Sequence, residues 1–158
     1  MSWFSRILGR NGNVKWKKEF LELETFFGKI SETLEDFAAT YNLMIEKYPH
    51  HGPEWAFRFR HPNGGVGQIE VEKSGHDHVI VRHSYHIDDY DKLTRFLKYP
   101  QGERCSLDNK TLRILLEKKL KIVLSWRKED LPPLKHKCYN WKWNYNLCTF
   151  FGGSQDTF

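Results

Sequence analysis

The chain has 158 residues, of which 28% are charged and 15% are aromatic, and its formal net charge is +5. Six Trp and eleven Phe residues argue against a disordered chain, and the length fits one domain. The net charge is moderate and acidic residues are mixed among the basic ones, which argues against a dedicated nucleic-acid binder. Three cysteines without a CxxC pair favour free thiols over a disulfide framework.

Hydropathy and the positions of turn-forming residues suggest the domain boundaries. No apolar run approaches the roughly 20 residues that span a bilayer, and no secretory signal pattern is present, so a cytoplasmic location is expected. We predict a single α+β domain over residues 14–151, between a short amphipathic or flexible segment, 1–13, and a flexible tail, 152–158. Within residues 2–10, four apolar residues share one helical side: Trp3, Phe4, Ile7 and Leu8. Peripheral membrane contact through this segment is an alternative to docking on the domain.

The most regular pattern runs from Trp16 to Tyr48. Apolar residues recur there at steps of three and four: Trp16, Phe20, Leu23, Phe27, Ile30, Leu34, Phe37, Tyr41, Met44 and Tyr48. The spacing predicts one long N-terminal helix, with a bend at Gly28 as an option, that covers a sheet. A coiled-coil homodimer would show the same spacing, although aromatic residues suit knobs-into-holes packing less well than Leu or Ile.

Three following segments, 55–59, 69–71 and 79–85, alternate between apolar and polar residues. The mainly apolar members all fall at odd positions. Because directly opposed residues of neighbouring strands share a face, this parity predicts an antiparallel meander. Its odd-numbered face would pack against the long helix.

The turn residues predict the strand register. A three-residue loop at 63–65, with Gly65 in a left-handed conformation, would pair Phe59 with Ile69 and Phe57 with Val71. A second loop at 74–76 would pair Ile69 with Val81 by the same test. On the outer face these registers place polar residues opposite each other: Arg58 against Glu70, and Glu72 against His78.

Shorter helices and a last strand are predicted after the meander. Asp88 and Asp89 suit the N-cap of a short helix that runs through Leu97. Ser106 or Asp108 opens another helix, although 120–126 also alternates and could form a strand. The apolar side of that helix comprises Leu112, Leu115, Leu116, Leu120 and Val123, and Lys119 interrupts it. A C-terminal aromatic-rich strand is predicted from alternating residues: Tyr139, Trp141, Trp143, Tyr145 and Leu147.

Two kinds of chemistry are weighed against ordinary structural roles. The candidate metal ligands are His76, His78, His83, His86, His136, Cys138 and Cys148. A zinc site needs three or four ligands close together, and the spacing of these residues does not predict such a cluster. No metal site and no cofactor are therefore predicted. No GxSxG, phosphate-binding glycine loop or HExxH motif is present. His83 is the single candidate catalytic base, because its strand face is otherwise apolar. Candidate groups to orient it are Tyr85, Asp91 and Tyr139.

Two kinds of partner remain. The basic residues Lys135, Lys137 and Lys142 accompany Tyr139, Trp141 and Trp143, a mixture that can stack bases beside phosphates, although a half-buried strand gives the same pattern. The outer face of the sheet would carry the predicted binding residues Arg58, Arg60, His78, Arg82 and His86. The functional hypothesis is a small non-catalytic protein-binding module, such as an adaptor, chaperone-like protein or inhibitor. A nucleic-acid-binding protein and an enzyme with a histidine base are the alternatives, and a homodimer is an open option.

Overall fold

The computed structural model describes residues 12–89 and 94–135, and in that part of the chain three α-helices accompany a seven-stranded antiparallel sheet. The fold is therefore of the predicted α+β class. The helices are α1 (Gly12–Gly28), α2 (Ser31–Tyr41) and α3 (Asn109–Ser125). The strands are β1 (Met44–Lys47), β2 (Glu54–Arg60), β3 (Val66–Lys73), β4 (His78–Asp89), β5 (Thr94–Lys98), β6 (Glu103–Ser106) and β7 (Pro133–Lys135). Two short 3-10 helices are η2 (Pro49–His51) and η3 (Lys128–Asp130).

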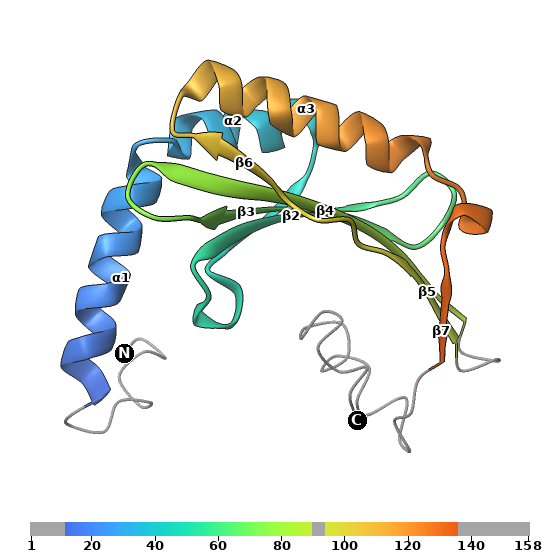
Figure 1. The fold of residues 1–158 in the computed structure, drawn as a ribbon, viewed down its shortest axis with the longest axis horizontal. Coiled ribbons are helices and arrows are strands. Elements are labelled where there is room, and N and C mark those ends of the chain that lie inside the picture. Colours follow the sequence, from blue (N-terminus) through green and yellow to red (C-terminus); the bar gives the residue numbers. More distant parts are fainter. Residues whose placement is uncertain (1–11, 90–93, 136–158) are drawn as a thin grey trace.

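The sheet is a curved layer with helices on one face (Figure 1). Its strand order is β1-β2-β3-β4-β5-β7, and β6 pairs with β4. Helices α2 and α3 lie side by side over the convex face, while α1 extends beyond one end of the sheet. No helix of the described ranges covers the opposite face, which we call the open face.

The parity predicted for the sheet is confirmed by burial. Six odd-numbered strand residues are almost completely buried: Trp55, Phe57, Ile69, Val71, Val79 and Val81. They form one core with residues of the two covering helices, including Leu34 and Phe37 of α2 and Leu112 and Leu116 of α3. The odd-numbered face therefore meets helices, as the alternation indicated.

The prediction of one long helix from Trp16 to Tyr48 is wrong. Helix α1 ends at Gly28, and α2 ends at Tyr41 because Asn42 adopts a left-handed conformation (φ 53°). The amide of Leu43 then donates to the carbonyl of Ala38 at 2.9 Å, and the chain continues as strand β1. Seam residues such as Phe27 and Phe37 are buried in this chain's own core, so a coiled-coil seam is not their role.

Aromatic contacts attach α1 to the sheet. Phe27 stacks on Trp55 of β2 with ring centroids 5.5 Å apart. Farther out along the helix, Phe20 meets Tyr48 edge to face at 5.3 Å, and Trp16 meets His51 at 5.0 Å. The seam thus packs on the sheet and on the loop that joins β1 to β2.

The predicted strand registers are wrong by two residues, although the parity is right. Phe57 pairs with Ile69 and Phe59 with Gly67, because the β2–β3 loop spans five residues and the amide of His61 donates to the carbonyl of Gly65. The ring of Phe59 lies over Gly67, where a Cβ atom would clash with it. The same shift pairs Ile69 with His83 in β4. The other corrected pairs are Trp55 with Val71, Val71 with Val81, Arg58 with Gln68, Glu70 with Arg82, and Glu72 with Ile80.

Two predictions about later helices are also settled. Residues 94–98 form β5 instead of a helix: Phe96 pairs with Ile87, and Asp88 and Asp89 are the last residues of β4. Helix α3 is confirmed with Asp108 as its N-cap, whose carboxylate accepts from the Thr111 amide at 2.7 Å. It continues to Ser125, so a strand at 120–126 is excluded. The segments 1–11, 90–93 and 136–158, with the predicted C-terminal aromatic strand, lie outside the described residues.

Lys119 enters the apolar side of α3 as an ion pair. It is 5% exposed, and its Nζ lies 3.0 Å from Oε2 of Glu103 on β6. Hydrogen bonds from Lys119 and then Lys118 hold the pKa of the Glu103 carboxyl below its ordinary value. The stabilisation is therefore present above the ordinary carboxyl pKa and is lost as the pH falls through the lowered one.

Glu103→Gln is expected to lower the free energy of unfolding by about 1 to 3 kcal/mol, because it leaves the buried Lys119 ammonium without its counter-ion. Water that reaches the half-exposed Glu103 keeps the loss below that of a fully buried pair. Lys119→Met is expected to be nearly neutral, and Glu103→Gln should cost little in that background. Urea unfolding of the four proteins gives the coupling, and equal costs of Glu103→Gln in both backgrounds would contradict the pairing.

Candidate functional site

Four of the five predicted binding residues lie on the open face, and each has an acidic neighbour there. Arg58, Arg82 and His86 occupy even positions of β2 and β4, which point away from the helices, and His78 begins β4 on the same parity. Each of these four has an acidic neighbour within 4.0 Å: Glu46 for Arg58, Glu72 for Arg82, Asp77 for His78 and Asp88 for His86. The charges of the two arginines are therefore compensated by their own neighbours, and they do not form an uncompensated binding patch.

A buried polar group on the same face involves residues that the sequence did not single out together. The Nε of Arg95 donates to Oδ1 of Asp88 at 2.7 Å, and both side chains are buried. Nε2 of His86 lies 3.9 Å from Oδ2 of Asp88. Burial lowers the pKa of His86. Sequence analysis did not predict this group because residues 88–97 were expected to form a helix, whereas the β4–β5 ladder brings Arg95 opposite Asp88.

His83, the candidate base, is a buried core residue. It is 4% exposed, and its ring stacks on Trp126 at 5.2 Å. Burial first, and the charge of Lys119 second, lower its pKa to about 4, so it is a weak base at neutral pH. Tyr85, one predicted orienting group, instead stacks on His61 at 3.8 Å and donates to the carbonyl of Gly64. Asp91 and Tyr139 lie outside the described residues.

The candidate metal ligands do not come together in the described part of the chain. Strand β4 continues to Asp89, so His83 and His86 point to opposite faces. Among residues 12–89 and 94–135, no group of three or more His, Cys, Asp or Glu side chains is arranged to hold a metal ion. His136, Cys138 and Cys148 fall outside those ranges. Within the same ranges, none of the helices is both long enough and apolar enough to cross a membrane.

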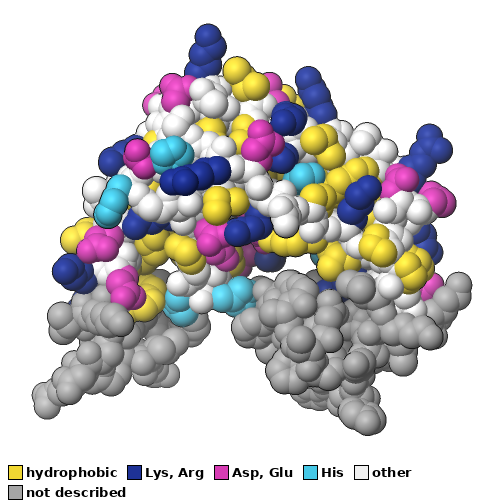
Figure 2. Space-filling view, in the orientation of Figure 1, with side chains coloured by type: hydrophobic (Ala, Val, Ile, Leu, Met, Phe, Trp, Pro, Cys, Tyr) yellow, Lys and Arg dark blue, Asp and Glu magenta, His cyan; other side chains and the backbone are white. Residues whose placement is uncertain are grey.

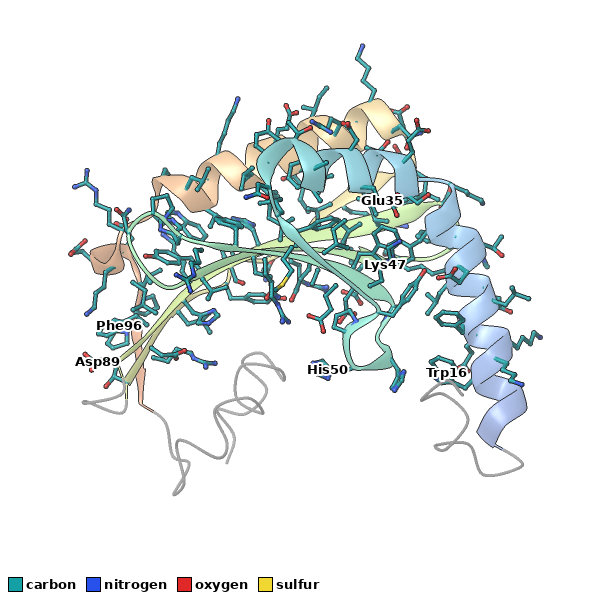
Figure 3. All side chains as sticks on the ribbon, turned by 180° about the vertical axis from the view of Figure 1, so that it is seen from behind. Trp16, Glu35, Lys47, His50, Asp89 and Phe96 are labelled. Atoms are coloured by element: carbon teal, nitrogen blue, oxygen red, sulfur yellow. The ribbon has the colours of Figure 1, made fainter. Side chains whose placement is uncertain are left out.

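Charge on the molecular surface is mixed. Figure 2 shows Lys and Arg side chains interspersed with Asp and Glu over the visible face. Figure 3 shows one such pair where α2 meets β1, Glu35 with Lys47, whose Nζ donates to Oε1 at 2.7 Å. Of the predicted nucleic-acid residues, Lys135 lies in β7, and the others are outside the described residues. Paired surface charges give little support to phosphate binding.

One surface groove is mainly apolar, and we call it the α2–α3 groove. It has a volume of about 460 Å³ and lies between the end of α2, the second half of α3 and the end of β2. Its lining residues are Tyr41, Asn42, Leu43, Phe59, Arg60, Pro62, Leu120 and Leu124. Arg60 is the one predicted binding residue that lines it.

Exposed hydrophobic side chains gather at this groove. Tyr41 and Leu124 line it and are 39% and 40% exposed. Isolated exposed hydrophobic residues are ordinary, but two of them in one apolar depression make it a candidate binding surface. The sequence missed this site because residues 41–43, 59–62 and 120–124 come together only in the fold.

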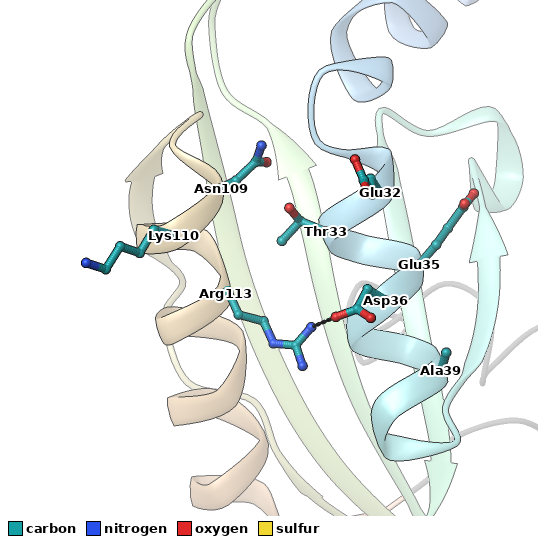
Figure 4. Close-up of a pocket in the computed structure, with 8 residues that line it drawn as sticks. All are labelled: Glu32, Thr33, Glu35, Asp36, Ala39, Asn109, Lys110 and Arg113. Carbon is teal, nitrogen blue, oxygen red and sulfur yellow. Dashed lines mark hydrogen bonds and ion pairs between the residues drawn. The ribbon is translucent and has the colours of Figure 1, made fainter.

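A second depression, of about 730 Å³, separates the first halves of α2 and α3 (Figure 4). Arg113 crosses it from α3, and its Nη1 donates to Oδ2 of Asp36 on α2 at 2.5 Å. Nε of Arg113 donates to Glu117 at 2.8 Å, and the guanidinium also lies 5.5 Å from the ring centroid of Phe37. Arg113 therefore joins the two helices, which gives this depression a structural explanation.

Comparisons with protein-family models, with curated proteins and with solved structures find no match to this chain.

Proposed function

We propose that this chain is a non-catalytic protein-binding module, of the adaptor, chaperone-like or inhibitor kind, and that it binds its partner through the α2–α3 groove. The observation that carries the proposal is the apolar lining of the groove together with the partly exposed side chains of Tyr41 and Leu124 in that lining. Bulky apolar side chains that enter such depressions supply most of the binding free energy in many protein interfaces.

The electrostatics of the other surfaces favour this choice. The arginines of the open face are occupied by their own acidic neighbours, so a partner there would have to displace existing ion pairs. The low pKa of His83 and its contact with Trp126 argue for a packing role over acid-base chemistry. The groove, by contrast, offers apolar surface that water solvates poorly.

Capture experiments with matched variants test the proposal. Full-length protein with Leu124→Asp is expected to lose a stoichiometric partner that the wild-type protein captures from the native host, because a carboxylate would be desolvated in the groove. Ile114→Asp is the control, since Ile114 lies on the same helix, is 59% exposed and does not line the groove. Equal capture by all three proteins, or capture of nothing by the wild type, would overturn the proposal.

A further inference from the structure

The α2–α3 groove carries positive charge beside its apolar lining. Arg60 lines the groove at the end of β2 and makes no ion pair with the residues of 12–89 and 94–135. Lys121 is exposed on α3, directly after the lining residue Leu120 and one turn before Leu124. Arg60 is therefore available to an incoming anionic group, and Lys121 adds a second cation beside the groove.

Glu117, an acidic residue near the groove, is paired with an arginine of its own helix. Glu117 lies one turn before Lys121 on α3, and the Nε of Arg113 donates to its Oε1 at 2.8 Å. That bond first, with the Tyr41 hydroxyl and the charge of Lys121 contributing, lowers the pKa of Glu117. Arg113 is shared with Asp36, so Arg60, Arg113 and Lys121 together exceed Asp36 and Glu117 by one positive charge. The charge left over at the groove is positive.

We propose that the groove selects a protein segment in which a bulky apolar residue is flanked by carboxylates, a specificity that rests on the proposed function. The apolar side chain enters between Tyr41 and Leu124, onto Leu43, Phe59 and Leu120. The carboxylates face Arg60 and Lys121. Charge complementarity of this kind speeds association and excludes basic segments of equal hydrophobicity.

The same chemistry favours a peptide over a nucleic acid. A nucleic acid gains affinity by neutralising several phosphates along a cationic track, whereas the groove offers Arg60 in its apolar lining and Lys121 beside it. Six of its eight lining residues are apolar or aromatic: Tyr41, Leu43, Phe59, Pro62, Leu120 and Leu124. An amphipathic acidic segment matches both properties.

Binding of three dye-labelled synthetic peptides to the full-length protein, measured by fluorescence anisotropy, tests the inference. The first alternates Leu and Phe with Glu, the second has Lys in place of Glu, and the third has Ser in place of Leu and Phe. The first is expected to bind at least about tenfold more tightly than the other two. A single-stranded oligonucleotide of similar length is the nucleic-acid probe, and it is expected to bind more weakly than the first peptide.

Matched arginine variants test whether Arg60 supplies the positive charge that the acidic peptide contacts. Arg60→Glu is expected to weaken the first peptide about tenfold and to improve the second, while Arg60→Lys keeps most of the affinity. Arg104→Glu, at an exposed position of β6, should leave both affinities unchanged. The thermal unfolding midpoint of each variant shows whether it is folded.

Three results would overturn the inference: no preference for the acidic peptide, no effect of Arg60→Glu in a folded protein, or tighter binding of the oligonucleotide. Failure of the charge rule leaves the proposed function standing if Leu124→Asp still abolishes partner capture. If Leu124→Asp has no effect on capture, the proposed function fails as well. The two experiments therefore separate the surface from its specificity.

Discussion

Phe57→Ala is expected to lower the free energy of unfolding by about 3 to 5 kcal/mol. Phe57 is fully buried in β2, and its ring meets Phe37 of α2 edge to face at 5.7 Å. Truncation removes the contact between the sheet and its covering helix and leaves a cavity that the paired strands β1 and β3 cannot close. Urea unfolding monitored by circular dichroism measures the loss.

Two further substitutions serve as controls for Phe57→Ala. Phe57→Leu keeps most of the volume and should cost about 1 kcal/mol, so it remains measurable if Phe57→Ala does not fold. Ile114→Ala removes a large side chain from an exposed site on α3 and should change the stability by less than about 0.5 kcal/mol. Similar losses for Phe57→Ala and Ile114→Ala would contradict the assignment of the odd-numbered face to the core.

His83→Leu is expected to reduce the loss of stability on acidification by about 3 kcal/mol between about pH 7 and pH 4. The pKa of His83 is lowered by burial to about 4, whereas the unfolded chain has the ordinary value of 6.5. Below pH 6.5 the His83 side chain binds a proton in the unfolded state but not in the folded state. The free energy of unfolding therefore falls as the pH drops towards 4. A leucine has no proton to bind and fits an apolar site of similar size.

The difference between variant and wild type isolates this effect from the carboxylates that titrate in the same range. Stability is measured by urea unfolding at several pH values, and His76→Leu, at an exposed turn position, is the control that should keep the wild-type profile. Parallel profiles for His83→Leu and wild type would show that His83 does not carry the pH dependence.

The buried face of the sheet could be predicted from the alternation of apolar and polar residues, because a strand that is covered on one face needs apolar residues at every second position. The register was not readable from the glycines alone, since Gly64 and Gly65 suggested a shorter loop than the observed five residues. The deciding signal was Gly67, because the large ring of Phe59 needs an opposite residue without a side chain.

The errors in the helices have a common physical cause. Local signals at Asp88 and Asp89 resemble a helix N-cap, but pairing of β5 with β4 satisfies the same backbone groups in a sheet. The seam from Trp16 to Tyr48 keeps helical spacing beyond α1 and α2, because residues of both helices pack on the same core. Met44, a member of that seam, is largely exposed at the edge of the sheet instead.

The α2–α3 groove could hardly be predicted from the sequence. Leu124 falls outside the buried side of α3, where Leu112, Leu116, Leu120 and Val123 face the sheet. An apolar residue outside the buried side of a helix is common on protein surfaces, so Leu124 alone predicts nothing. Its position beside Tyr41 and Arg60 depends on long-range packing that periodicity cannot reveal.

Hydroxyl-radical labelling of the full-length protein, with and without its captured partner, tests the groove most directly. Tyr41 and Tyr99 form a matched pair, 39% and 49% exposed, with Tyr41 in the groove and Tyr99 bonded to Glu70 of the open face. The partner is expected to suppress labelling of Tyr41 and Leu124 while Tyr99 and Ile114 keep theirs. Suppression at Tyr99 with unchanged labelling of Tyr41 and Leu124 would place the partner on the open face and contradict this assignment.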